Sequence, residues 1–457
     1  MATSEASVDS IRSLAARLAS GSTTAEALTQ RALARIDEPD GQGHHAFVSV
    51  QRDAALAQAR AADQLRAAGI VPSPLAGIPV SVKDLFDLAG LPTTAGSTLL
   101  ASASPALQDA PIVARLRAAG AVIVGRTNMT EFAIGGLGLN PHYGDPLNPY
   151  DRATRRIPGG SSSGAAVSVT DAMAVGAIGT DTAGSVRIPA ALCGIVGFKP
   201  TRWRVPTEGA FPLAPTLDSI GPLANTVECC ALLDAALAGE PVSAPDEAAL
   251  QRVHLGVPET LVLDGLEPHV AQCFEAALQR LSDCGVRITR FRFAELAQIP
   301  HANRTGGFSI IEGYAIHRAM LDRHREKYDP IIAGRLSLGA KATAADYIEL
   351  LTERARLTVL ADRLTAGFDA LAFPTVPLTA PPVAGFDDAA RWVETNLRLI
   401  RNTSIANFLD RCALSLPCHP PGTAPVGLML TGERHQDRRL LGIGRAVERA
   451  LRRSRHA

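Results

Sequence analysis

The chain has 457 residues, of which 46% are hydrophobic, so it is long enough to bury a large core. Its 45 basic and 45 acidic residues balance, which argues against a broad nucleic-acid surface and against binding to an anionic membrane. The seven cysteines include no Cys-x-x-Cys pair, the histidines show no zinc-ligand spacing, and MATSEASVDSIRSLAARLAS lacks the apolar segment of a secretion signal. We therefore expect a cytoplasmic protein with reduced thiols and no bound metal.

The first third of the chain alternates helical and strand patterns. Residues 23–26 have the spacing of a capping box, which predicts the start of an amphipathic helix, and a second, alanine-rich helix is expected over about 50–68. Apolar alternation predicts a strand over 78–83, and residues 111–119 predict a helix that begins with proline. The wholly apolar run 121–125 is typical of a strand buried on both faces, so this order implies parallel β-α-β connections.

The later elements keep an α/β character. In chain order we expect a small-residue helix over 164–174, a buried strand over 174–181, a short helix beginning near Arg187, strongly helical sequence over 308–370, an ordered proline-rich loop over 373–383 and a last helix over 437–453. No internal repeat or low-complexity linker interrupts the chain. One large α/β domain over residues 1–457 is therefore the economical prediction.

Three consecutive serines, Ser161 to Ser163, follow the glycines Gly159 and Gly160 in the segment PGGSSSG. A flexible linker would have polar, structureless flanks, but Ile157 and Pro158 precede the two glycines and an apolar helix follows the serines. Two glycines before a serine at a helix start make a tight turn that presents backbone N–H groups. We therefore predict a functional loop here rather than a linker.

Two further side chains are candidates for chemistry, and the local pattern leaves each of them open. Ser185, in GTDTAGSVRIP, either caps the next helix or belongs to a turn of small residues that forms an oxyanion hole. Lys83 ends the strand VSVK; either it extends to solvent and pairs with Asp84, or it is buried with a lowered pKa and acts as a base. His142, in a loop rich in Pro and Gly, is expected to be structural.

Three segments taken together resemble the amidase signature family: AGIPVSVKDLFDLAGLPTTAGS at 76–97, IPGGSSSGAAVSV at 157–169 and GTDTAGSVRIPAALCGIVGFKPT at 179–201. Further matches are VGRTNMTEFA, NPHYGDPLNPYD, TLDSIGPLA, FDALAFPTVPLTAPP and PVGLMLTG. The resemblance implies the amidase signature fold, in which a large twisted mixed β-sheet is covered by helices on both faces. Its signature core would span about 70–225, and a more variable helical and loop region about 226–400.

The resemblance also implies a catalytic triad of a lysine and two serines, one of which follows a cis peptide bond, and it implies no cofactor. Lys83 corresponds to the lysine of the triad. Ser161 corresponds to the serine that follows the cis bond and relays a proton, and Ser185 to the nucleophile. A neutral lysine would take a proton from Ser161 while Ser161 takes one from Ser185, and the reversed relay would protonate the leaving amine.

Around the triad, the resemblance implies three groups of supporting residues. The oxyanion hole corresponds to the backbone N–H groups of Thr182, Ala183, Gly184 and Ser185. Positions that hold the loops by hydrogen bonds correspond to Ser162, Asp181 and Arg187. The substrate pocket corresponds to Met129, Phe132, Gly159 and Gly160. Ala183 stands where the family usually has glycine, and Ser163 and Ala165 stand in a segment that is more often Gly-Gly-Ser, but neither departure removes a catalytic atom.

The activity implied is hydrolysis of a small or aryl carboxamide to a carboxylate and ammonia or an amine through a serine acyl-enzyme. The expected partner is a small amide substrate, with no nucleic acid and no membrane, and relatives are often homodimers. One alternative is the A subunit of a glutamyl-tRNA(Gln) or aspartyl-tRNA(Asn) amidotransferase, a glutaminase, although its tyrosine-rich second-half stretch has no clear counterpart here. A non-catalytic scaffold is a remote alternative, because all three triad residues are retained.

Overall fold

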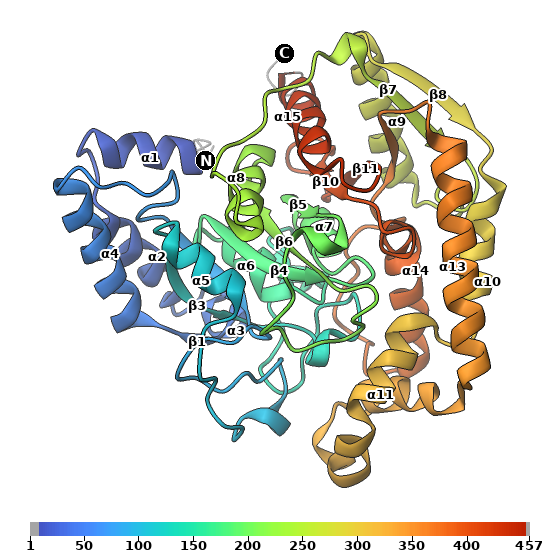
Figure 1. The fold of residues 1–457 in the computed structure, drawn as a ribbon, viewed down its shortest axis with the longest axis horizontal. Coiled ribbons are helices and arrows are strands. Elements are labelled where there is room, and N and C mark those ends of the chain that lie inside the picture. Colours follow the sequence, from blue (N-terminus) through green and yellow to red (C-terminus); the bar gives the residue numbers. More distant parts are fainter. Residues whose placement is uncertain (1–8, 454–457) are drawn as a thin grey trace.

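One mixed β-sheet organises the part of the chain that the structure, a computed structural model, describes, which is residues 9–453. Its eleven strands have the order β1-β3-β2-β4-β6-β5-β10-β11-β9-β7-β8, so β1 and β8 are the two edge strands of the sheet (Figure 1). β2 is parallel to β3 and β4, whereas β4 is antiparallel to β6, so the predicted mixed sheet is confirmed. The strands are β1 (Phe47–Val50), β2 (Pro79–Lys83), β3 (Val122–Thr127), β4 (Gly176–Asp181), β5 (Val196–Lys199), β6 (Ser219–Ala224), β7 (His254–Pro258), β8 (Arg287–Phe291), β9 (Ala370–Pro374), β10 (Ala413–Pro417) and β11 (Gly427–Thr431).

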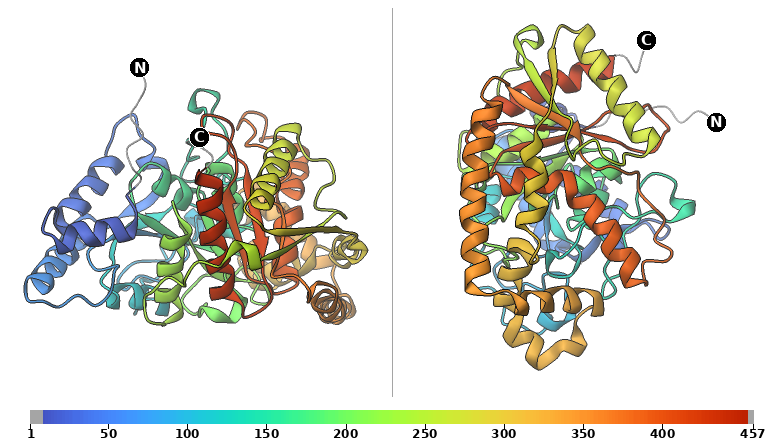
Figure 2. Two further views of the ribbon diagram at one scale, coloured as in Figure 1. Left: turned by 90° about the horizontal axis from the view of Figure 1, so that it is seen from above. Right: turned by 90° about the vertical axis from the view of Figure 1, so that its right-hand side faces the viewer.

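Helices surround this sheet, as the two views in Figure 2 show. Within residues 9–453 they are α1 (Ile11–Ala19), α2 (Ala25–Ile36), α3 (Gly43–Ala46), α4 (Arg52–Ala67), α5 (Pro111–Ala118), α6 (Ser163–Thr170), α7 (Arg187–Cys193), α8 (Val227–Ala238), α9 (Pro268–Asp283), α10 (Gln298–Ala302), α11 (Gly307–His324), α12 (Pro330–Ser337), α13 (Ala344–Thr365), α14 (Ala389–Phe408) and α15 (Asp437–Arg453). The predicted helices over 111–119 and 437–453 agree with α5 and α15 to within a residue.

Both faces of the sheet are covered. α8 packs on β4, β5 and β6 and also contacts α5 and α15. α6 packs on β2, β3, β4 and β6, and it contacts α7, which in turn contacts α14. On β4, a Cβ at Gly176 would meet Leu233 of α8, whereas a Cβ at Gly179 would meet Ser162 at the start of α6. Because residues an odd number apart point to opposite faces of a strand, the two helices cover opposite faces of the sheet.

The signature segments meet at one edge of the sheet because β2 and β4 are parallel neighbours. Every residue of both strands is buried, as their apolar sequences predict. Val82 pairs with Ile178, so the carboxyl end of β2 at Lys83 lies beside the carboxyl end of β4 at Asp181. Residues far apart in sequence are thereby brought to the same edge, where open α/β sheets place their ligands.

The predicted capping box at residues 23–26 is wrong by one residue. α2 begins after Thr24, whose Oγ1 accepts a hydrogen bond from the Ala27 N–H at 3.0 Å. The N–H groups of Ala25 and Glu26 donate instead to the carboxylate of Asp63 on α4. A tertiary contact thus supplies acceptors for the backbone N–H groups of the first helical turn, and the Glu26 carboxylate is not needed as a reciprocal cap.

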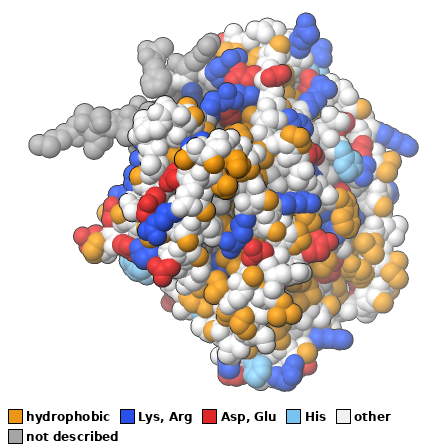
Figure 3. Space-filling view, turned by 60° about the vertical axis from the view of Figure 1, so that its left-hand side comes forward, with side chains coloured by type: hydrophobic (Ala, Val, Ile, Leu, Met, Phe, Trp, Pro, Cys, Tyr) orange, Lys and Arg blue, Asp and Glu red, His pale blue; other side chains and the backbone are white. Residues whose placement is uncertain are grey.

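The surface agrees with the balanced composition, since basic, acidic and apolar side chains are interspersed on the face in Figure 3. None of the seven cysteines forms a disulfide bond, and all but Cys284 are buried, as expected of small core residues. Among residues 9–453, no helix is both long and apolar enough to cross a bilayer.

Candidate active site

Lys83, the last residue of β2, lies at the centre of the signature segments. Its side chain is fully buried, and its Nζ donates to Ser161 Oγ at 2.7 Å and to Thr180 Oγ1 at 2.9 Å. Asp84 does not pair with it, because the Asp84 carboxylate lies 3.4 Å from Arg126 Nε and accepts hydrogen bonds from Thr94 and Gly96. Of the two readings that the sequence left open, the buried lysine is therefore the one observed.

Burial also makes this lysine a base. It lowers the pKa of Lys83 to about 7, although the carboxylates of Asp181 and Asp218 act in the opposite direction. An ordinary lysine is almost wholly protonated at neutral pH and has no lone pair with which to accept a proton. At this pKa about half of the Lys83 amines are neutral at pH 7 and can accept one.

Ser161 lies in a loop that is buried rather than flexible. The Gly160–Ser161 peptide bond is cis, as the resemblance implied. The Ser161 carbonyl accepts the Thr130 N–H at 3.1 Å, and the Gly160 N–H donates to the Gly136 carbonyl at 2.7 Å. A Cβ on Gly160 would lie 2.6 Å from the Gly138 nitrogen, so only glycine allows these two backbones to approach. The linker interpretation of PGGSSSG is thus excluded.

Ser185 is the last residue of a sharp turn that comprises residues 182–185, which we call the 182–185 turn. The side chain of Ser185 does not cap α7, because the N–H groups of Val186 and Arg187 donate to the Asp181 carboxylate. Gly184 has φ 134°, and a Cβ there would lie 2.2 Å from Thr403 Oγ1, so this position needs glycine. Within residues 9–453, the four backbone N–H groups of the turn find no protein acceptor. They are free to bind an oxyanion.

The two serine loops touch through their backbones, since the Ser162 N–H donates to the Ser185 carbonyl at 3.2 Å. Among the described residues no hydrogen bond joins the hydroxyl groups of Ser161 and Ser185. Only the first link of the expected relay, from Lys83 to Ser161, is therefore present as a hydrogen bond. Catalytic hydrogen bonds often form only once substrate is bound, so the second link stays a prediction.

Asp181 and Arg187 form a fully buried pair that supports the turn. Arg187 donates from Nε and Nη2 to the two carboxylate oxygens of Asp181 at 3.0 and 2.8 Å, and Asn407 Nδ2 adds a bond at 2.9 Å. Burial alone would raise the pKa of the Asp181 carboxyl, but Arg187 outweighs it and lowers that pKa to about 2. Ser162 Oγ contributes a longer bond of 3.4 Å to the Thr180 carbonyl. These contacts fit the loop-holding roles expected of Ser162, Asp181 and Arg187.

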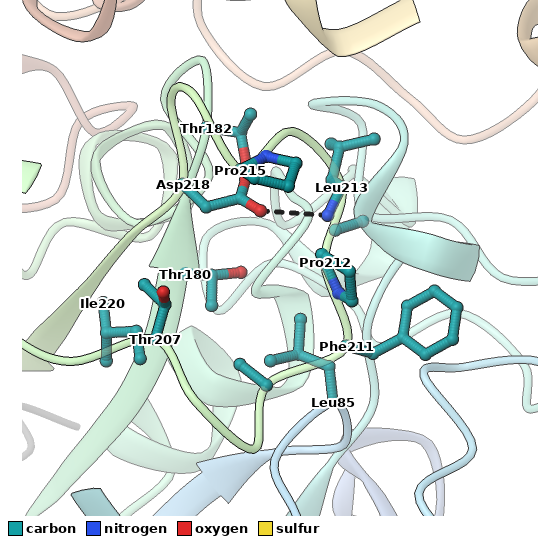
Figure 4. Close-up of a pocket in the computed structure, with 12 residues that line it drawn as sticks. Leu85, Thr180, Thr182, Thr207, Phe211, Pro212, Leu213, Pro215, Asp218 and Ile220 are labelled. Atoms are coloured by element: carbon teal, nitrogen blue, oxygen red, sulfur yellow. Dashed lines mark hydrogen bonds between the residues drawn. The ribbon is translucent and has the colours of Figure 1, made fainter. Parts of the chain in front are cut away.

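A pocket with a volume of about 110 Å³ adjoins the 182–185 turn (Figure 4). Its lining is mostly apolar and comprises Leu85, Ala133, Thr180, Thr182, Thr207, Ala210, Phe211, Pro212, Leu213, Pro215, Asp218 and Ile220. Thr180 joins the pocket to the Lys83 amine through a hydrogen bond, and Thr182 belongs to the turn. The pocket therefore lies beside both the Lys83 amine and the 182–185 turn.

The residues expected to bind substrate do not line this pocket. Met129 and Phe132 are buried, and the Phe132 ring lies 5.3 Å from the ring of Phe211, which does line it. Gly159 and Gly160 shape the Ser161 loop. A direct role of these four residues in binding stays a prediction. Sequence reasoning missed Asp218 as a pocket residue, although the quoted segment TLDSIGPLA contains it.

Comparison with known proteins identifies the family. The sequence model of the amidase family matches residues 27–441. A protein of Comamonas testosteroni called 2-amino-5-chloromuconic acid deaminase is 39% identical over 403 residues, 86% of each chain. The A subunit of the glutamyl-tRNA(Gln) amidotransferase of Thermobifida fusca is 37% identical over 96% of this chain and 95% of its own.

Solved structures agree. A crystal structure described as an amidase superimposes with a TM-score of 0.86 at 32% identity and covers 96% of this chain and 99% of its own. The peptide amidase of Stenotrophomonas maltophilia gives 0.83 at 28% identity, with 98% and 97% coverage. The chain therefore belongs to the amidase signature family, whose members are hydrolases acting on C–N amide bonds.

Proposed function

We propose that this protein hydrolyses a small or aryl carboxamide to a carboxylate and ammonia or an amine, with Ser185 as the nucleophile. The observation that carries the proposal is the fully buried Lys83 amine, 2.7 Å from Ser161 Oγ and with its pKa lowered to about 7. A base of this pKa beside a serine hydroxyl is what the acylation of a serine nucleophile requires at neutral pH.

In the proposed reaction Lys83 accepts the Ser161 proton, Ser161 accepts the Ser185 proton, and Ser185 Oγ forms a bond to the amide carbon. The resulting oxyanion accepts hydrogen bonds from the N–H groups of the 182–185 turn. The proton held by Lys83 then returns through Ser161 to the amide nitrogen, the C–N bond breaks and the amine leaves. Water attacks the acyl-enzyme by the same relay and releases the carboxylate and free Ser185.

The pocket supports an uncharged acyl group. Neither lysine nor arginine occurs among its twelve lining residues, and Asp218 is its single charged group. A substrate with a free carboxylate on its acyl portion would therefore bring that charge close to the Asp218 carboxylate, without a cation in the pocket to balance the two. The apolar side chains of Leu85, Phe211 and Leu213 suit an aliphatic or aryl group.

The experiment measures ammonia release by the purified protein from propionamide, benzamide, succinamic acid and glutamine. We expect hydrolysis of the first two, and loss of more than about 10³-fold in kcat with Ser185→Ala or Ser161→Ala. Ser163→Ala is the matched control, because the Ser163 hydroxyl is buried on the same loop without a hydrogen-bond partner among the described residues. Ser185→Ala protein with undiminished activity would rule the proposal out.

Glutamine is included because several relatives are named as the A subunit of glutamyl-tRNA(Gln) amidotransferase, one of them at 37% identity. A protein that releases ammonia from glutamine and leaves both simple amides intact would support that second function. Robust hydrolysis of simple amides without any partner would exclude it, and it would also exclude a non-catalytic scaffold. 2-Aminomuconic acid extends the panel, since the Comamonas relative is named as a deaminase of a chlorinated form.

A further inference from the structure

Residues 211–218 form one wall of the pocket, and we call them the wall loop. Asp218, the last residue of this loop, holds the loop in place. The partly buried Asp218 side chain accepts hydrogen bonds from the N–H groups of Leu213 and Ala214 at 3.0 Å each through Oδ2. Its Oδ1 accepts a hydrogen bond from Thr182 Oγ1 at 2.6 Å. Figure 4 shows Asp218, Leu213 and Thr182 together on one side of the pocket. A single carboxylate thus ties the wall loop to the 182–185 turn.

Charged groups from elsewhere in the chain hold the same loop but do not reach the turn. Glu312 of α11 accepts the Thr216 N–H at 3.0 Å, and Arg354 of α13 donates to the Thr216 carbonyl at 3.3 Å. Arg202 donates to the Pro215 carbonyl. Substitutions of Glu312 and Asp218 can therefore be compared directly. Each carboxylate accepts a hydrogen bond from the backbone of the wall loop, and only Asp218 also binds Thr182.

We propose that Asp218 is a positioning residue for amide hydrolysis, which aligns the oxyanion-binding N–H groups of the 182–185 turn with a substrate group seated against the wall loop. The inference rests on the proposed function, because it assigns that turn to the oxyanion. An oxyanion hole works only if its donors are fixed before the charge develops. The turn carries the glycine Gly184 at φ 134°, so an external anchor is needed to fix it.

Asp218 accepts hydrogen bonds fully through both carboxylate oxygens, as the link between the wall loop and the turn requires, only when it is ionised. Burial raises the pKa of the Asp218 carboxyl to about 6, and the bonds from Thr182 and from the backbone act in the opposite direction. The charged groups that influence it are Lys83, Arg202 and Glu312. Measurements at pH 8 therefore compare the ionised form with each variant.

The first test compares Asp218→Ala with Glu312→Ala on the best amide of the panel. Both variants loosen the wall loop, so both should raise KM. Only Asp218→Ala should also lower kcat, by roughly tenfold to a hundredfold, which is below the ~10²–10³-fold loss of removing an oxyanion donor itself. Equal kcat values for the two variants would overturn the inference.

The second test gives a result even if the Asp218→Ala variant fails to fold. Thr182→Val removes the hydroxyl and keeps the side-chain shape, so kcat should fall by about tenfold, whereas Thr182→Ser should restore it to within about threefold of wild type. The double variant that combines Thr182→Val with Asp218→Ala should have the same kcat as Asp218→Ala alone, because either substitution already breaks the link. A Thr182→Val variant with wild-type kcat, or strictly multiplicative losses, would contradict the inference.

Ser185→Ala, measured in the same assay, separates the two proposals. If Ser185→Ala stays active, the assignment of the reacting serine fails whatever the other variants do. If Ser185→Ala is inactive and Thr182→Val keeps the wild-type kcat, the proposed function stands and only the positioning role of Asp218 is lost.

Discussion

The buried amine of Lys83 makes a prediction about stability as well as catalysis. Lys83→Met keeps the length and apolar volume of the side chain and removes its charge and its bonds to Ser161 and Thr180. We expect amide hydrolysis to fall by orders of magnitude, because no base remains. We expect the folded state, however, to become more stable at neutral pH, because wild-type folding either buries the protonated amine or strips its proton, and both cost free energy.

The size of this effect follows from the two pKa values. Lys83 has a pKa of about 7 in the folded protein against 10.5 in the unfolded chain, so between these values the unfolded chain binds more protons and wild-type stability rises with pH. The penalty is about 4 kcal/mol at pH 7 and about 2 kcal/mol at pH 9. Losing the two hydrogen bonds costs about 1–3 kcal/mol at any pH. The variant should therefore exceed wild type by about 2 kcal/mol at pH 7 and equal it near pH 9.

Urea unfolding of both proteins at pH 7, 8 and 9, extrapolated linearly to water, measures this difference. All other titrating groups are common to the two proteins and cancel. The informative quantity is the change of the difference with pH, since the hydrogen-bond cost is constant. Stability curves that run parallel from pH 7 to pH 9 would show that Lys83 titrates normally, and the argument for a neutral base at pH 7 would be refuted.

Three further outcomes are expected. Below pH 7 the kcat/KM of amide hydrolysis should approach a fall of about tenfold per pH unit, because only the neutral Lys83 amine accepts a proton, and it should fall more steeply below pH 6, where Asp218 is also protonated; a flat profile between pH 5 and 7 would be inconsistent with the role of Lys83. Arg187→Met should lower the free energy of unfolding by about 3–5 kcal/mol, since Asp181 is left buried and unpaired; a urea midpoint unchanged from wild type would argue against that. Thr24→Ala should cost about 1 kcal/mol through the lost cap on Ala27 and leave kcat unaltered, with Thr24→Ser as the control; no loss of stability would speak against the observed cap.

The sequence predicted that Lys83 and Ser161 belong to one candidate site, and they are hydrogen-bonded, because the constraints on these segments are local. Gly160 is required by a close backbone approach and Gly184 by its φ of 134° and the adjacent Thr403 side chain, and such requirements leave a glycine in the sequence that can be recognised. The apolar runs of β2 and β4 likewise predicted two buried strands, which bring Lys83 and Asp181 to one edge. Tertiary contacts then decided between the open readings. The burial of Lys83 shows that its side chain does not extend to solvent. The Asp181 carboxylate, and not the Ser185 hydroxyl, accepts the N–H groups at the start of α7.

The pocket could not be predicted in the same way. The wall loop is fixed by Glu312 and Arg354, which come from helices about a hundred residues or more further along the chain. Nothing in the local pattern of α11 or α13 marks these two side chains as partners of Thr216. Met129 and Phe132 show the same limit. The sequence alone does not distinguish an apolar residue that lines the pocket from one that, like Phe132, packs behind it.

The strand order has a consequence for how this protein is made. β5 lies between β6 and β10, and the pair Lys199 and Ala413 belongs to neighbouring strands. The ribosome must therefore synthesise the chain beyond Ala413 before one edge of β5 can find its partner. Until then a buried, apolar strand stays open to pairing with other chains. A fragment that ends near residue 225 would contain every triad residue, and we expect it to aggregate rather than hydrolyse amides.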